Sequence, residues 1–415
     1  MITSEAKKQT IKNSLQETRM KRTKQVCKVL DLKVVDNKLN LLERQQLKMF
    51  FVEAKWLYNY ILSLDKPFEY NYQTNPIFKM NKQGTLEEVR LQYLSAKNRQ
   101  NVVFILQQNI KSLAASKKHK RKVGKLKFTS SYRSIELSQY GITHKIVSKN
   151  RIKINGIKRP LWVLGLEQIT PEMEIANAKL MNLSDGYHIK LTIFFYPKEM
   201  HNNETKPNVG LDFGITRNIT TSDGEFFSCY VDESERLKRL QHRVAKSKKG
   251  SNNRYERRLL MQREYQKLNN RKVDKANKLV NYLLTKYNHT VIQDENLLGW
   301  KSSRFGKQVQ HSYMGIVKTK LIRSDRTIVI NRFLPTTKLC PNCGTIHDEI
   351  TLSDRWFTCD CGYNEDRDIK SAKTILKIGM EHTEYKPVEC NISTLETSKP
   401  TLKQVCTVKQ EAPSL

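Results

Sequence analysis

Hydrophobic and polar positions change their period early in the chain. Residues 24–35 alternate and are rich in β-branched side chains, which predicts a strand. From about residue 40 the apolar residues recur at intervals of three and four, which predicts an amphipathic helix. Its apolar face comprises Leu47, Phe50, Phe51, Ala54, Tyr58 and Ile61. A second helical region is predicted over about 86–115, where Thr85 and Glu88 have the spacing of a capping box.

Residues 132–200 return to strand character, as short β-rich runs separated by Gly, Asn, Asp and Pro turns. We expect these strands to close a small barrel with the strand at 24–35, and the two helices to form a bundle inserted into it. Residues 116–127 hold seven Lys or Arg and no acid, which fits either a solvated linker or a strap that binds a nucleic-acid backbone.

The second half alternates strands and helices. Residues 207–230 predict three strands joined by tight turns, and the basic region 232–288 predicts a helical hairpin broken at 248–253. A strand is predicted within 288–300, and a polar, flexible, lid-like segment at 301–311. The later predicted elements are a helix over 312–324, a strand over 327–333 and a helix that begins at Asp368.

Composition adds a strong positive charge to this pattern. The 415 residues include 74 Lys and Arg against 41 Asp and Glu, a formal net charge of +33. Such an excess repels itself unless a polyanion neutralises it, so nucleic acid is the expected partner. The sequence shows no apolar core of signal-peptide length and no apolar stretch of membrane-spanning length. We therefore expect no membrane partner, and we expect the reducing interior of a cell as the compartment.

Two close cysteine pairs indicate a metal site. They are Cys340 with Cys343 and Cys359 with Cys361. A glycine, Gly344 or Gly362, follows each pair and relaxes the turn, although the second pair is one residue shorter than the first. Four soft thiolates suit one structural zinc ion. His347 is an alternative ligand, and free or disulfide-bonded thiols are the alternative interpretation.

Acidic residues next to glycines and strand ends indicate a second site. Asp212 lies between Gly210 and Gly214 in the first strand of the second half, which leaves space around its carboxylate, although an Asp in such a turn is often structural. Glu295 follows the strand within 288–300, where open α/β sheets place their sites, and Asp294 is its rival.

Asp368 is the third candidate because it directly precedes a periodic helix, and Asp366 competes with it. Carboxylate oxygens are the ligands that Mg²⁺ prefers, and two such ions assist phosphodiester hydrolysis. No Ser-His-Asp order, nucleotide-binding glycine loop or His-Glu-x-x-His motif competes with this interpretation.

These motifs together resemble a known group. GLDFGITRN at 210–218, DENL at 294–297, the paired cysteines and DRDIKSAKTIL at 366–376 resemble the three split motifs of RuvC-type nuclease domains. They are similar to those of transposon-encoded TnpB proteins and of miniature type V-F CRISPR effectors. The chain departs from many TnpB proteins at Lys370, where those often have Asn, and in its basic N-terminal extension, so we favour the type V-F side.

The resemblance implies an RNA-guided DNA endonuclease that acts in antiviral defence or in a transposon. Its implied partners are a guide RNA, a target double-stranded DNA beside a short adjacent motif, and, for type V-F members, a second copy on one guide. Asp212, Glu295 and Asp368 match the catalytic positions that bind Mg²⁺ or Mn²⁺. The four cysteines match a zinc module that binds the target nucleic acid. The expected location is the cytoplasm of a prokaryotic cell.

The implied fold is α+β and multidomain: a wedge-type β-barrel with an inserted helical recognition bundle, and a RuvC (RNase H-like) α/β nuclease domain with an inserted zinc-binding module. The expected parts are a basic arm at 1–23, the barrel at 24–39 and 130–203, the helical domain at 40–129, the nuclease domain at 207–338 and 363–380, the zinc module at 339–362 and a disordered tail at 381–415.

Two other functions are compatible with parts of the pattern. An unguided RuvC-like resolvase or structure-specific nuclease would use the same carboxylates, but it would have little use for the front barrel and bundle. A non-catalytic nucleic-acid-binding protein held together by zinc would not need the three carboxylates to coexist.

Overall fold

The computed structural model describes residues 4–73, 76–81, 83–196, 206–351 and 354–381. It divides the chain into two compact units, Met1–Met200 and His201–Leu415. The predicted tail lies outside the described residues except for its first residue. None of the described helices combines the length and the apolar character needed to cross a membrane.

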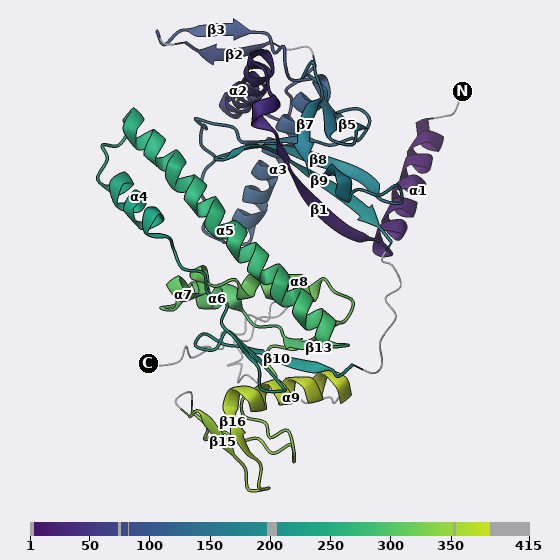
Figure 1. The fold of residues 1–415 in the computed structure, drawn as a ribbon. Helices are drawn as coiled ribbons and strands as arrows, with labels where there is room; N and C mark the ends of the chain where they lie inside the picture. Colours follow the sequence, from purple (N-terminus) through teal and green to yellow (C-terminus); the bar gives the residue numbers. More distant parts are fainter. Residues whose placement is uncertain (1–3, 74–75, 82, 197–205, 352–353, 382–415) are drawn as a thin grey trace. The chain divides into compact units, whose positions relative to one another are not determined.

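The first unit is built on a seven-stranded antiparallel sheet in the order β4-β8-β9-β1-β7-β6-β5 (Figure 1). The strands are β1 (Val26–Val34), β4 (Ser134–Leu137), β5 (His144–Ser148), β6 (Arg151–Ile154), β7 (Leu161–Leu164), β8 (Glu174–Leu183) and β9 (Gly186–Phe195). The sheet confirms the predicted strand at 24–35 and the strand-rich region at 132–200, and it adds β7, which was not predicted. The closure of this sheet into a barrel stays a prediction.

The helices of the first unit are α1 (Ser4–Thr23), α2 (Leu41–Ser63) and α3 (Ala96–Lys118), with the short 3₁₀ turns η1 (Asp36–Lys38) and η2 (Leu166–Gln168). The side chain of Asn40 caps α2, and its predicted apolar face is buried against the sheet and α3 in one hydrophobic core. The last turn of α1 is fastened to the sheet because Lys21 and Arg22 both pair with Glu174, at 2.8 and 2.6 Å.

The prediction of a helix over 86–115 is wrong at its start. Residues Leu86–Val89 form strand β3, which pairs with β2 (Ile77–Met80) in a hairpin. Thr85 does not cap a helix, because its hydroxyl accepts a hydrogen bond from Asn81, at 2.6 Å, across the hairpin turn. The helix begins ten residues later, and Ser95 caps it by accepting the backbone N–H of Asn98.

The second unit is built on a five-stranded sheet in the order β12-β11-β10-β13-β14. Strands β10, β13 and β14 are parallel, and β11 and β12 continue the sheet antiparallel from β10. The strands are β10 (Val209–Phe213), β11 (Ile219–Thr221), β12 (Phe226–Phe227), β13 (Thr290–Gln293) and β14 (Thr327–Ile330). This order confirms the three-strand start that was predicted for 207–230.

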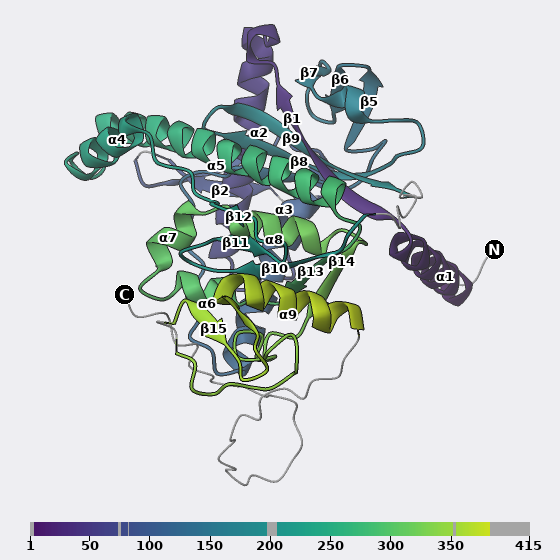
Figure 2. The ribbon, with the colours of Figure 1, turned by 60° about the horizontal axis from the view of Figure 1, so that its bottom comes forward.

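Helices cover both faces of this sheet (Figures 1 and 2). One face is covered by α5 (Asn252–Lys286) and α8 (Met314–Ile322), and the other packs against α9 (Arg367–Glu381). Helix α4 (Glu235–Ala245) packs against α5. The predicted helical hairpin is present as α4 and α5, and its break lies at 246–251, two residues before the predicted 248–253. A separate two-stranded sheet, β15 (Trp356–Thr358) with β16 (Asn364–Asp366), carries the second cysteine pair between its strands.

The segment 301–311 differs from the predicted polar lid, because it contains helical turns. These are the end of α6 (Leu297–Lys301) and all of α7 (Gly306–His311). Asn296 caps α6 by accepting the backbone N–H of Gly299, and the buried ring of Phe305 precedes α7. A few side-chain anchors therefore give helical structure to a segment whose overall composition is polar.

Candidate active site and metal centre

Strand β10 and helix α9 place two of the predicted acids side by side. A Cβ at Gly210 would lie 2.0 Å from the carbonyl oxygen of Ala372, so only glycine allows the helix to approach this strand. Asp212 lies two residues beyond Gly210 and therefore faces the same side of the sheet. Asp368 lies four residues before Ala372, on the same side of α9. The two carboxylates consequently face each other next to the contact between helix and strand.

The third acid comes from the neighbouring parallel strand. Leu211 of β10 is in register with Ile292 of β13, so the chain leaves β13 at the level of Asp212. Asp294 and Glu295 follow directly, at the carboxyl end of β13. Asp212, Glu295 and Asp368 therefore converge at one edge of the sheet although they lie far apart in the sequence.

The electrostatic surroundings of Asp212 agree with this arrangement. Burial raises the pKa of Asp212 well above its ordinary value, and the negative charges of Glu295 and Asp368 raise it further. Burial also raises the pKa of Glu295 to about 6. Burial opposes the ionisation of Asp212 and Glu295, and the charge of Asp368 acts on Asp212. A divalent cation would therefore be strongly stabilising at this site.

Asp294 and Glu295 have different surroundings. Asp294 accepts hydrogen bonds from Lys318, at 3.1 Å, and from Arg332. Burial works against its ionisation, but these two cations lower the pKa of Asp294 below its ordinary value. The carboxylate of Asp294 is therefore held by these two cations. The same cations also favour the charge of Glu295, but burial outweighs them and the pKa of Glu295 stays raised.

Asp366 and Asp368 also have different roles. Asp366 accepts the backbone N–H groups of Asp368, at 3.0 Å, and of Ile369, at 3.3 Å, and so caps α9. It also forms an ion pair of 2.7 Å with Arg217. Asp366 thus fixes the start of the helix, and Asp368 is the acid that faces Asp212.

Arg217 is a residue of this site that the sequence analysis did not single out. Its guanidinium lies 3.6 Å from the carboxylate of Asp368 and 4.3 Å from the ring centre of Phe226. It brings one positive charge to the edge of the carboxylate site. Only its position in the turn after the first motif, GITRN, associates it with the site in the sequence.

The four predicted cysteines form a compact group. The sulfur atoms of Cys340 and Cys361 lie 3.7 Å apart, and those of Cys343 and Cys359 lie 3.5 Å apart. Tetrahedral zinc with bonds of about 2.3 Å requires sulfur separations of roughly 3.8 Å. All four sulfur atoms lie within 4.8 Å of one another, and among the described residues no other group of three or more His, Cys, Asp or Glu side chains brings its ligand atoms this close. The cluster therefore fits one tetrahedral metal ion.

The turns around the cysteines support the same conclusion. Gly344 and Gly362 both have positive φ, at +77° and +86°, as the predicted tight turns require. His347 does not replace a cysteine: its Nε2 lies 3.1 Å from the sulfur of Cys359, and its Nδ1 lies 2.8 Å from Glu349. A histidine held by a carboxylate and directed at a ligand sulfur orients the site from outside. The described cysteines are free thiols and form no disulfide.

A buried lysine connects the cysteine cluster to the carboxylate site. Lys370, two residues after Asp368, is fully buried and donates to the carbonyl oxygens of Thr336, at 3.2 Å, Thr337 and Leu339, at 3.2 Å. Its ammonium also lies 4.1 Å from the ring centre of Phe357 in β15. Burial lowers the pKa of Lys370 to about 7. The first turn of α9 is thereby joined to the backbone that leads into the cysteine cluster.

Comparisons with known proteins cover most of the second unit. Residues 195–302 match a family model described as "Probable transposase" (OrfB_IS605), and residues 315–375 match one described as "Cas12f1-like, TNB domain". A curated protein of Streptomyces pristinaespiralis named "Putative RNA-guided DNA endonuclease" is 32% identical over 187 residues, which are 42% of this chain and 46% of that protein. The chain thus matches less than half the length of this relative.

The first matched range contains Asp212 and Glu295, and the second contains Asp368 and all four cysteines. These matches confirm the predicted resemblance: over residues 195–302 and 315–375 the chain is similar to TnpB-type transposon proteins and to miniature Cas12f-type effectors.

Proposed function

We propose that this protein is an RNA-guided DNA endonuclease with a RuvC-type active site. One observation carries the catalytic part of the proposal. Three acids from separate segments, Asp212, Glu295 and Asp368, come together at one edge of a mixed α/β sheet, where burial and then the charges of Glu295 and Asp368 raise the pKa of Asp212. The guide RNA and the target DNA come into the proposal from the similarity to the relatives, and the charge of +33 supports a nucleic-acid partner.

The three carboxylates would hold Mg²⁺ or Mn²⁺. Divalent cations bound there would activate the attacking water and stabilise the leaving oxygen of a phosphodiester. Asp212 is fixed by strand β10, and Asp368 by the capped start of α9. The geometry of the site is therefore set by rigid elements before a substrate arrives.

The four cysteines would hold one structural Zn²⁺. Their cluster is anchored to α9 through Lys370, so the zinc module and the catalytic acids share a support. By similarity, this module would contact the target nucleic acid. The 16 Lys and Arg within 236–278, against three acids, would neutralise phosphates of the guide or the target.

An unguided RuvC-like nuclease is the alternative. It would keep the same acids and lose the dependence on RNA. Whether the protein belongs to a CRISPR system or to a transposon, and whether two copies share one guide, stay predictions of the resemblance.

Replacement of Asp212 tests the catalytic assignment. Asp212→Ala should reduce cleavage of a plasmid that carries a target matching the bound RNA by more than about a hundredfold, as expected for loss of one electrostatic stabiliser of the reaction. Binding of RNA and DNA should be unchanged. Asp325→Ala, at an exposed acid of the same unit, is the matched control. Undiminished cleavage by Asp212→Ala would refute the assignment.

A further inference from the structure

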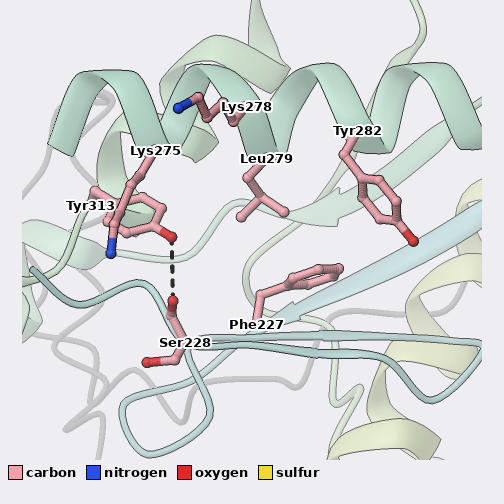
Figure 3. A pocket seen from close by; sticks show the side chains of 7 residues that line it. All are labelled: Phe227, Ser228, Lys275, Lys278, Leu279, Tyr282 and Tyr313. Atoms are coloured by element: carbon pink, nitrogen blue, oxygen red, sulfur yellow. Dashed lines mark hydrogen bonds between the residues drawn. The ribbon is translucent and has the colours of Figure 1, made fainter. Parts of the chain in front are cut away.

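A shallow pocket opens between α5 and the end of β12, and the proposed reaction does not use it. Its volume is about 380 Å³. Its lining residues, shown in Figure 3, are Phe227, Ser228, Lys275, Lys278, Leu279, Tyr282 and Tyr313. Helix α5 packs on the opposite face of the sheet from α9, so this pocket is separate from the carboxylate site.

We propose that this pocket binds one unstacked base of a single-stranded nucleic acid, and that Lys275 and Lys278 contact the flanking phosphates. The proposal rests on the proposed function for the class of ligand, and it adds a specific binding site that the carboxylates do not provide.

The aromatic wall of the pocket is held in place before any ligand binds. The rings of Phe227 and Tyr282 lie 5.9 Å apart at an interplanar angle of 65°. The Tyr282 hydroxyl donates to Glu225 at 2.8 Å, and the Tyr313 hydroxyl donates to the backbone carbonyl of Ser228 at 3.3 Å (Figure 3). Tyr282 is nevertheless 41% exposed. A fixed and accessible aromatic side chain is what a base needs for stacking.

The charge around the pocket favours a polyanion. Lys275 is exposed, and within the described part of the chain no acid lies within ion-pair distance of it. Lys278 pairs with Asp274 at 2.8 Å, but both side chains are largely exposed and such a pair is weak. Phosphates can therefore approach both lysines at little cost.

A single strand fits this pocket better than a duplex does. The bases of a duplex are stacked on one another and cannot present a free face to Tyr282. An unpaired base can insert its face against the ring while its phosphates stay at the lysines on the rim. Single-stranded DNA and single-stranded RNA share this chemistry, and the experiment below separates them.

Photo-crosslinking on the full chain tests the proposal. The full chain, expressed without its native flanking DNA and so without the proposed guide, is irradiated with oligonucleotides that contain one 4-thiothymidine in DNA or one 4-thiouridine in RNA. We expect a crosslink in the peptide that contains Phe227 or Tyr282. Tyr282→Ala should weaken binding of the same oligonucleotide by about fivefold or more, the effect of losing one stacked base. Lys275→Gln should lower the slope of log affinity against log salt by about 1.

Two further variants make the result specific. Tyr282→Leu removes the aromatic ring but keeps an apolar side chain packed against Phe227, so it protects the fold better than Tyr282→Ala. It should weaken binding of the oligonucleotide as much as Tyr282→Ala does. Tyr265→Ala is the matched control, because Tyr265 lies on the same helix, is 40% exposed and has a hydrogen-bonded hydroxyl. It should leave the affinity and the crosslink unchanged.

The outcomes separate this inference from the proposed function. Crosslinks only outside the pocket, with unchanged affinity of Tyr282→Leu, would overturn the inference and leave the catalytic proposal intact. A pocket crosslink in a protein that still cleaves DNA as Asp212→Ala would overturn the catalytic proposal and support the pocket. A crosslink with DNA alone would assign the pocket to a displaced or target strand, and one with RNA alone to the guide.

Discussion

Asp294 and Glu295 are adjacent in sequence and near the same two cations, but their pKa values shift in opposite directions. Lys318 and Arg332 stabilise the charge of Asp294, whereas burial opposes the charge of Glu295 and raises its pKa to about 6. Lys318 and Arg332 compensate the charge of Glu295 only in part. An acid whose pKa stays raised by burial costs stability when it is ionised, which is typical of functional sites. The two residues should therefore respond differently to removal of their charge.

Glu295→Gln should abolish cleavage and leave stability equal or up to about 2 kcal/mol higher, since the neutral side chain relieves a carboxylate whose pKa is raised. Asp294→Asn should lower stability by roughly 1–3 kcal/mol, because it removes the charge partner of the nearly buried Lys318, while some cleavage remains. Thermal unfolding and cleavage of a matched target measure both. The reverse pattern would make Asp294 the functional acid.

The sequence alone could predict where the candidate acids lie, but it could not decide which acid of two close in sequence faces the site. Both members of Asp294/Glu295 and of Asp366/Asp368 have the right residue type at the right strand or helix end. The choice depends on partners that are distant in sequence, such as Arg332 for Asp294 and the capping role of Asp366. Arg217 was missed for the same reason.

Helix α9 shows how one element serves both candidate sites. Its first turn carries Asp368 and the buried Lys370, and the backbone carbonyl groups bound by Lys370 lead into Cys340. Further along, Lys377 donates to the carbonyl oxygen of Pro341 at 2.7 Å. The position of the helix and the position of the first cysteine pair are thus coupled by hydrogen bonds from lysine side chains to backbone carbonyl groups.

Lys370→Met should loosen the cysteine cluster, because the carbonyl groups of Thr336 and Thr337 lose their lysine donor, at a cost of roughly 1–3 kcal/mol for each group left unsatisfied. The carbonyl group of Leu339 keeps the hydroxyl of Thr374 as a donor. We expect faster transfer of zinc to a chromogenic chelator and a lower melting temperature. Lys377→Met, which removes one bond at a more exposed place, should have a smaller effect. Equal rates of zinc release in Lys370→Met and the unchanged protein would contradict the coupling.

Strand β5 gives a pH-dependent contribution to the stability of the first unit. Burial lowers the pKa of His144 to about 4, from an ordinary value of 6.5. Between these values the unfolded chain binds a proton that the folded chain does not, so stability falls as the pH decreases from 6.5 to 4, by at most about 3 kcal/mol. Above pH 6.5 this contribution is fully present.

His144→Phe should remove most of that pH dependence, because the phenylalanine ring can keep the contact with Tyr140, whose ring centre lies 5.5 Å away. In both proteins the two tryptophans of the second unit are replaced by phenylalanine, so that the fluorescence of Trp56 and Trp162 reports on the first unit. Urea unfolding then gives the free energy of unfolding of this unit at pH 7 and at pH 5. An identical loss of unfolding free energy from pH 7 to pH 5 in the two proteins would show that His144 does not cause the pH dependence.

Helices with an apolar pattern that extends over many residues were predicted correctly. The predictions failed where a local turn or cap determines the secondary structure. The helix from residue 40 and the hairpin of α4 and α5 were predicted from apolar spacing and from the KKGSNN turn. The start of the 86–115 region was wrong because Asn81 fixes a hairpin turn that imitates a capping pattern. Segment 301–311 looked like a polar lid because its short helices depend on single anchors such as Asn296.

The whole molecule consists of two units, and its net charge indicates the class of its binding partner. A net charge of +33 predicted a nucleic-acid partner, and the matches to transposon and Cas12f1-like families agree with that expectation. Which strands are neighbours in the seven-stranded sheet could not be predicted, because antiparallel runs of similar length allow several orders. The finer division into six parts stays a prediction.

The central claim is that a bound RNA selects the DNA that the carboxylates cut. We would express the chain with its native flanking DNA, sequence the RNA that co-purifies, and offer the complex plasmids with and without a matching target. If RNA guides the cleavage, one discrete structured RNA that ends in a variable segment co-purifies, and Mg²⁺-dependent cleavage is confined to the matching plasmid. Heterogeneous RNA that salt removes, or equal cleavage of both plasmids, would contradict guidance and leave an unguided nuclease.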